Sequence, residues 1–143
     1  YSFSTIGGGL NNTASNTYST ISGGVSNTAS GCFSSIGGGS LNTASNTYST
    51  ISGGTYNCAI AIYSTIAGGK FNTASGTFST ILGGLNNNTY GCANAMIVGS
   101  NIIADRICAT FVNNLSIKNI PTSSVGLPSG SIYRIGNAVC IVI

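Results

Sequence analysis

The sequence predicts an all-β protein, a parallel β-solenoid of about seven coils with 15 residues in each coil. Three observations support this fold: isoleucine recurs every 15 residues, a glycine pair follows it in most copies, and the intervening segments are rich in Thr, Tyr, Ser and Ile. Because self-similarity at a fixed period marks one structural unit per copy, we expect the phase to hold without an insertion. The isoleucine column, the expected repeat core, comprises Ile6, Ile21, Ile36, Ile51, Ile66 and Ile81, and Met96 is expected to continue it.

Each copy is predicted to contain two short strands and two tight turns. A helix would not tolerate the recurring glycine pair, whereas Thr, Tyr and Ile favour strands and glycine supplies the backbone angles of turns. Successive coils then stack at ~4.8 Å, the spacing between neighbouring strands. The isoleucine and alanine columns should point inward, because neighbouring strand residues alternate between faces. The asparagine column is expected to form amide ladders along the axis, and it comprises Asn12, Asn27, Asn42, Asn57, Asn72 and Asn87.

An aromatic column precedes the isoleucine column by three residues. Its members are Phe3, Tyr18, Phe33, Tyr48, Tyr63 and Phe78, and the column lapses at Ala93. The spacing predicts that Tyr18, Phe33, Tyr48, Tyr63 and Phe78 lie on the strand face opposite to isoleucine. Two interpretations remain open: the stripe is a seam between subunits, or it is a stacking surface for sugar rings. Because the chain is 42% hydrophobic and only 3% charged, we expect a homotrimer of parallel chains that covers this stripe.

The C-terminal part differs from the repeats. We expect three regions: the repeat solenoid over residues 1–108, a strand followed by a Pro- and Gly-rich turn linker over 109–130, and a β-hairpin over 131–143. Gly136 and Asn137 separate two apolar, β-rich runs, which is a typical signal for a two-residue hairpin turn. Such a hairpin could cap the open solenoid end, where unpaired strand edges invite stacking. Alternatively, the segment continues into another repeat domain.

Three copies of the repeat read "NTASNTYSTISGG", "NTASGCFSSIGGG" and "NTASGTFSTILGG". This pattern resembles the head-domain repeats of trimeric autotransporter adhesins and related repeats of virus and bacteriophage fibres, over about three quarters of the chain. The resemblance implies a left-handed parallel β-roll whose three chains pack side by side, without catalytic residues. The repeats are one residue longer than the commonest adhesin repeat. The closing phrase "IPTSSVGLPSGSIYRIGNAVCIVI" is similar to the end segments of phage and large-virus fibres or virion appendages and favours that branch over a bacterial adhesin.

Composition argues against an enzyme. The chain has no histidine and one acidic residue, Asp105, so a general acid–base pair cannot be assembled from carboxylates or imidazoles. We expect no catalytic residue, no cofactor and no metal site, because the cysteines also lack the paired spacing of metal ligands. The four basic residues are scattered, which predicts no nucleic-acid partner. No apolar run approaches the ~20 residues of a membrane helix, so we predict no membrane insertion.

The five cysteines are expected to be free within one chain. Cys32 and Cys92 are expected to share a column but lie four coils apart, about 19 Å at the strand spacing, whereas a disulfide needs Cα atoms within about 7 Å. Cys92 and Cys108 should point to opposite faces. Free thiols favour assembly in a reducing cytoplasm, as a virus would undergo, over secretion. Bridges between chains at the seam remain open.

The predicted function is therefore a structural fibre segment: a tail-fibre-like virion appendage, or a cell-surface adhesin, that mediates host or surface attachment. A cell-surface glycan or receptor is its expected partner, besides its own copies, and its expected location is the outer face of a virion or cell. Ice binding is an alternative from another class, because Thr5, Thr20, Thr50, Thr65 and Thr80 form a column broken only by Ser35. Tyr and Phe two residues before each Thr are expected to roughen that face and to disfavour ice.

Overall fold

The computed structural model describes residues 3–116, 120–123, 125–129, 131–135 and 138–141. The described chain contains strands and turns but no helix, and no described segment forms a helix suited to crossing a membrane. It divides into a repeat unit that ends at Asn113 and a C-terminal unit that begins at Asn114. The parallel β-solenoid predicted from the period is confirmed in the first of these units.

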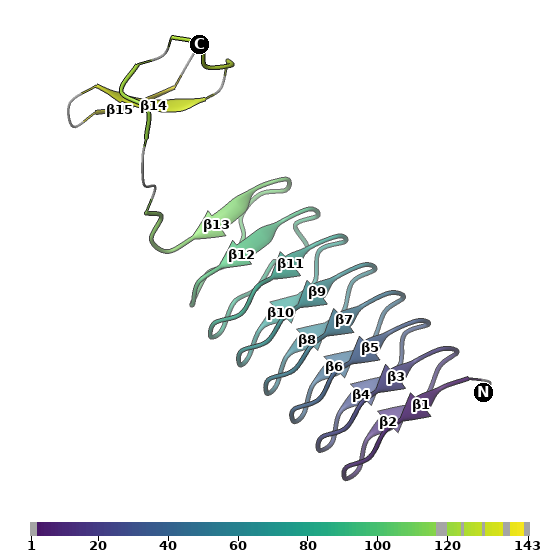
Figure 1. Ribbon diagram of the computed structural model, residues 1–143. Coiled ribbons are helices and arrows are strands. Elements are labelled where there is room, and N and C mark those ends of the chain that lie inside the picture. Colours follow the sequence, from purple (N-terminus) through teal and green to yellow (C-terminus); the bar gives the residue numbers. More distant parts are fainter. Residues whose placement is uncertain (1–2, 117–119, 124, 130, 136–137, 142–143) are drawn as a thin grey trace. The chain divides into compact units, whose positions relative to one another are not determined.

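Two parallel sheets build the solenoid, and each coil of its regular part contributes one strand to each sheet (Figure 1). The eight-stranded sheet has the order β1-β3-β5-β7-β9-β11-β12-β13, and the five-stranded sheet has the order β10-β8-β6-β4-β2. Strands of the first sheet are β1 (Thr5–Ile6), β3 (Thr20–Ile21), β5 (Ser35–Ile36), β7 (Thr50–Ile51), β9 (Thr65–Ile66), β11 (Thr80–Ile81), β12 (Met96–Val98) and β13 (Thr110–Val112). Those of the second are β2 (Thr13–Ala14), β4 (Thr28–Ala29), β6 (Thr43–Ala44), β8 (Cys58–Ala59) and β10 (Thr73–Ala74).

The core lies between the two sheets. Isoleucine pairs with isoleucine along the first sheet, as in Ile36↔Ile51, and alanine pairs with alanine along the second, as in Ala44↔Ala59. The isoleucine side chains from Ile21 to Ile81 and their alanine partners are completely buried. Ile6 differs from the prediction because it is 45% exposed: it belongs to the first described coil, which has a neighbouring coil on one side only.

Asparagine ladders join the coils, as the sequence predicted. The Asn57 side chain donates from Nδ2 to the carbonyl oxygens of Gly53 at 3.1 Å and Gly69 at 2.9 Å. Its Oδ1 accepts hydrogen bonds from the backbone N–H and the Nδ2 of Asn72, both at 3.1 Å. Most partners are therefore backbone groups, so the ladder satisfies the backbone of the glycine-containing turn as well as its own amides.

Buried serines form a further column that the sequence did not reveal. Ser49 donates its hydroxyl hydrogen bond to the carbonyl oxygen of Asn46 at 2.6 Å, and the same bond spans three residues in the neighbouring coils. All described buried side-chain polar atoms have a hydrogen-bond partner. The narrow coil can therefore bury Ser and Asn beside Ile without leaving unpaired polar groups.

The repeat departs from 15 residues in two successive coils, contrary to the expectation of an unbroken period. Thr80 pairs with Met96 and Ile81 pairs with Ile97, so Ile97 continues the buried column whereas Met96 is 40% exposed. An extra residue enters in the turn around Tyr90 and Gly91. The next coil is one residue shorter, since Met96 pairs with Thr110. Strand β13 therefore stacks on the solenoid beyond the expected limit of residue 108.

The C-terminal unit contains an antiparallel pair, β14 (Ile132–Ile135) and β15 (Ala138–Ile141). Their register pairs Ile135 with Ala138, as a two-residue connection requires. The predicted turn residues Gly136 and Asn137 lie outside the described residues.

Candidate functional site

The aromatic column forms one edge of the solenoid, in the turn between the five-stranded and the eight-stranded sheets. Tyr18, Tyr48 and Tyr63 each have φ of 57°, and Phe33 and Phe78 have similar values, so all five residues adopt the left-handed conformation. The prediction that they lie on a strand face opposite to isoleucine is wrong. They precede isoleucine by three positions, but the turn in which they lie, rather than strand alternation, sets their direction. We call this column, from Phe3 to Phe78, the aromatic ladder.

The rings of the aromatic ladder stack face to face along the solenoid axis. Adjacent ring centroids lie 4.8–5.3 Å apart, and the ring planes differ by 2–13°. The spacing matches the distance between strands, because each coil contributes one ring in the same conformation. Each inner ring is covered on both faces by other rings, so the ladder presents ring edges outward.

Exposure follows this geometry. The four inner rings, of Tyr18, Phe33, Tyr48 and Tyr63, are 43–46% exposed, whereas the terminal Phe78 is 55% exposed. The residue that follows Phe78 in the column is Asn94, with φ of 54°, and its N–H bonds to the carbonyl of Thr77. The sequence placed the lapse at Ala93, and the extra residue of this coil accounts for the difference.

A left-handed backbone is uncommon for bulky residues, whereas Asn adopts it more readily. Holding an aromatic residue there costs of order 1–3 kcal/mol. Asn94 has the same conformation in the same column, so the fold does not require a ring at this position. Stacking between rings offsets part of the cost, since aromatic pairs contribute about 0.5–1.5 kcal/mol. The aromatic ladder is therefore a row of exposed residues whose backbone conformation is unfavourable for their side chains.

A second, shorter patch lies at the opposite edge, in the turn from the eight-stranded to the five-stranded sheet. Leu41, Tyr56 and Phe71 occupy equivalent positions with φ of 55–58°, and each is 39–47% exposed. The rings of Tyr56 and Phe71 stack at 5.2 Å, and Lys70 Nζ lies 4.8 Å from the Phe71 centroid. Sequence reasoning missed this patch, although each member directly precedes an asparagine of the asparagine column. We call it the second edge patch.

The hydroxyl row of the eight-stranded sheet is in register. Thr5 pairs with Thr20, Thr20 with Ser35, and Thr50 with Thr65. The aromatic residues that were expected to roughen this face lie in the turn before each strand rather than on the strand.

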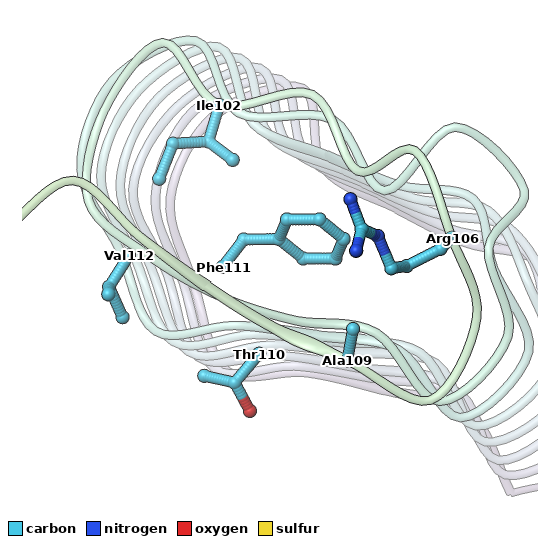
Figure 2. A pocket seen from close by; sticks show the side chains of 6 residues that line it. All are labelled: Ile102, Arg106, Ala109, Thr110, Phe111 and Val112. Atoms are coloured by element: carbon cyan, nitrogen blue, oxygen red, sulfur yellow. The ribbon is translucent and has the colours of Figure 1, made fainter. Parts of the chain in front are cut away.

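The last coil ends in an open pocket of about 360 Å³, lined by Ile102, Arg106, Ala109, Thr110, Phe111 and Val112. Figure 2 shows the Phe111 ring and the Arg106 side chain inside the outline of this coil. Phe111 pairs with Ile97 and so continues the buried column. Arg106 Nε donates to Asp105 Oδ1 at 2.8 Å, which lowers the pKa of the exposed Asp105 carboxyl.

Among the described residues no group of acidic residues or cysteines could hold a metal ion. Cys32, Cys58, Cys92 and Cys108 are free, and burial raises the pKa of the Cys58 thiol. The expectation that Cys32 and Cys92 share a column is wrong. A Cβ added to Gly76 would meet the carbonyl of Cys92, just as one added to Gly31 would meet the carbonyl of Asn46. Cys92 therefore belongs to the column of Gly31 and not to that of Cys32. Cys108 follows Asn94 in the column of the aromatic ladder, and its N–H bonds to the carbonyl of Ala93.

No protein-family model matches the chain, and no curated protein matches it either. The residues and their geometry therefore carry the functional proposal.

Proposed function

We propose that this chain is a segment of an attachment fibre, a homotrimeric rod on the outer face of a virion or cell, with a structural and adhesive role rather than a catalytic one. The observation that carries the proposal is the aromatic ladder, a row of exposed, stacked rings along one edge of the solenoid. A virion appendage is favoured over a bacterial adhesin by the wording of the C-terminal segment.

The ladder geometry supports a seam between chains over a surface for sugar rings. A sugar stacks on the face of an aromatic ring, but the inner rings cover one another's faces at 4.8–4.9 Å. Ring edges, in contrast, can pack against the faces or edges of aromatic rings from another chain. Two further chains with the same ladder supply such partners in the same register, because all copies share one coil spacing.

Burial supports the same assembly. A monomer would expose the ladder, a continuous row of aromatic rings along one edge, whereas soluble monomers rarely expose a large contiguous apolar patch. Cyclic symmetry covers a row of this kind without leaving an open edge. A trimeric rod also carries several copies of any receptor site, and multivalent attachment raises avidity.

The test is the oligomeric state of a matched pair of variants, measured by native mass spectrometry and light scattering. The double variant replaces Tyr48 and Tyr63 with asparagine. Asparagine is chosen because Asn94 already adopts the same backbone conformation at the equivalent position of a later coil. We expect the parent chain to be a trimer and this variant to dissociate while keeping its β-sheet circular dichroism. Tyr56→Ser, at the opposite edge, is the control and should remain trimeric.

A stable parent monomer would refute the seam, and so would an equal loss of trimer in the Tyr56→Ser control. A crosslinking experiment provides an independent readout. Cys108 lies in the ladder column, so a variant that retains only Cys108 should form disulfide-linked dimers of chains upon mild oxidation. A variant that retains only Cys58, which is half-buried on β8, should not.

We also propose that the β14–β15 hairpin caps the solenoid. What supports this role is the open interior of the last coil, where the pocket reaches Phe111 of the core column. A chain that ends at Asn113 should then associate end to end as its concentration rises. If the truncated and full chains show equal light scattering, the hairpin has no capping role.

Ice binding is the second candidate, because the hydroxyl row Thr20, Ser35, Thr50 and Thr65 is in register along the eight-stranded sheet. An ice-recrystallisation assay separates the candidates. Inhibition that disappears upon Thr50→Leu, but survives the ladder variant, would favour ice binding over the fibre.

A further inference from the structure

The two aromatic columns end at the same coil, and each is followed by an asparagine. Phe78 is followed by Asn94 in the aromatic ladder, and Phe71 is followed by Asn86 in the second edge patch. Because asparagine is shorter than phenylalanine, the outer part of each terminal ring has no ring over the face that points toward the next coil. At these two steps the terminal rings therefore lack the second covering ring of the inner ladder, and at Phe71 the flexible Lys70 side chain lies over the ring instead.

A cation lies at one of these steps. Lys70 is the sole charged residue among the first 104 residues of the sequence, and its Nζ lies 4.8 Å from the centroid of the Phe71 ring. Tyr56 occupies one face of this ring at 5.2 Å, so the pair of aromatic residues supports the ring from one side. No acidic residue precedes Asp105 in the sequence, so the repeat coils before Asp105 contain no carboxylate side chain that could pair with Lys70.

An amide completes the step. Asn86 Nδ2 donates to Asn101 Oδ1 at 3.3 Å, and both residues are exposed. The step thus combines an aromatic face, an ammonium group and an exposed amide within the span of two coils. An aromatic face packs against the C–H bonds of a sugar, an ammonium attracts a carboxylate, and an amide can bond a hydroxyl.

We propose that the step formed by Phe71, Lys70 and Asn86 binds a sugar ring that carries a carboxylate. The Lys70 ammonium, which lies over the Phe71 ring in the free chain, swings to pair with the ligand carboxylate, and the face it leaves stacks on the sugar. Asn86 orients a ring hydroxyl. Tyr56 is a positioning residue that holds the Phe71 ring from behind. The proposal deepens the attachment role by naming a ligand class and rests on it for its biological meaning. The site itself lies within one chain and on the edge opposite to the proposed seam.

The strained backbone supports a ligand role for this position. Phe71 has φ of 58°, and the residues that follow it in the same column, Asn86 and Asn101, have similar values of 55° and 57°. Asparagine satisfies the fold there at a lower backbone cost than phenylalanine. The aromatic residue is confined to two coils, in contrast to the ladder, which runs through six described coils. A seam along the rod would not be so short, whereas a site for one or two sugar rings would be.

Saturation-transfer NMR and isothermal titration on the full chain test the proposal. The probes are the methyl glycosides of glucuronic, galacturonic and N-acetylneuraminic acid, each paired with a neutral sugar: methyl glucoside for glucuronic acid and methyl galactoside for the other two. We expect at least one acidic sugar to bind more tightly than its neutral partner. Lys70→Thr, which copies Thr55 of the preceding coil, should weaken that binding about two- to fivefold, as expected for an exposed ion pair. Phe71→Asn should abolish it.

The matched control is Tyr90→Asn, which removes a 75% exposed aromatic ring that belongs to neither the aromatic ladder nor the second edge patch. It should leave the acidic-sugar affinity unchanged. Three outcomes would overturn the proposal: none of the acidic sugars binds, acidic and neutral sugars bind equally, or Phe71→Asn binds like the parent. The oligomeric state of the same samples separates this site from the seam. A trimer without sugar binding refutes the site alone, and sugar binding by a monomer refutes the seam alone.

Discussion

Replacing Gly54 with alanine tests the stacking of the coils most directly. Gly54 has φ of +93°, a conformation that residues with a side chain rarely adopt. An added Cβ would overlap the carbonyl oxygen of Gly69 in the next coil and would lie 2.6 Å from Asn57 Nδ2. Backbone atoms cannot rotate away as a flexible side chain can, so the two coils would have to separate locally.

The structure allows the cost to be estimated. The Gly69 carbonyl accepts hydrogen bonds from Thr55 N at 3.0 Å and from Asn57 Nδ2 at 2.9 Å, and both weaken when it moves. A strained backbone conformation costs about 1–3 kcal/mol, and each hydrogen bond contributes about 1 kcal/mol. We therefore expect Gly54→Ala to lower the free energy of unfolding by about 3–5 kcal/mol.

Gly53→Ala is the control, because an added Cβ there meets no heavy atom within 4 Å. We expect this change to alter the free energy of unfolding by at most about 1 kcal/mol. Guanidinium unfolding, followed by far-ultraviolet circular dichroism at one protein concentration, measures both variants, since association would shift the midpoints. Equal midpoints for the two variants, or a Gly54→Ala variant as stable as the parent, would refute the proposed contact between coils.

Three further predictions concern the core, the ladder of amides and the thiols. Ile51→Ala should cost about 2–5 kcal/mol in unfolding experiments, whereas Ile6→Ala should cost much less because Ile6 is 45% exposed; similar losses would contradict the assigned core. Asn57→Ala removes four hydrogen bonds from a buried site, so its melting temperature should fall, and an unchanged value would mean that other groups replace the amide. Burial raises the pKa of the Cys58 thiol, so at mildly alkaline pH it should react with iodoacetamide more slowly than the exposed Cys108, as mass spectrometry can resolve.

The backbone conformation of the turns was not predictable from the spacing of residues. Tyr48 lies three residues before Ile51, and strand alternation alone would place it on the opposite face. In the structure its backbone is left-handed, at φ of 57°, and the ring leaves the coil at its edge. A sequence period reports which residues are equivalent, but it carries no information about φ at a non-glycine position.

The same limit explains the error at Met96. Counting in steps of 15 puts Met96 in the core, but the chain places an extra residue before it and buries Ile97 instead. Both side chains are apolar, so composition could not separate the two alignments. Burial of a β-branched residue in a column of isoleucines, together with strand register, decided the outcome in three dimensions.

The amino-acid sequence by itself determined the parallel solenoid, the buried isoleucine and alanine columns and the asparagine ladders, because in-register stacking makes every coil repeat the contacts of the last. Only the tertiary structure decided which edge each aromatic residue occupies and that ladder rings cover one another's faces. It also brought the Lys70 ammonium over the Phe71 ring. The physical reason is that stacking depends on residues one period apart, whereas a surface site depends on turn angles and side-chain lengths in adjacent coils.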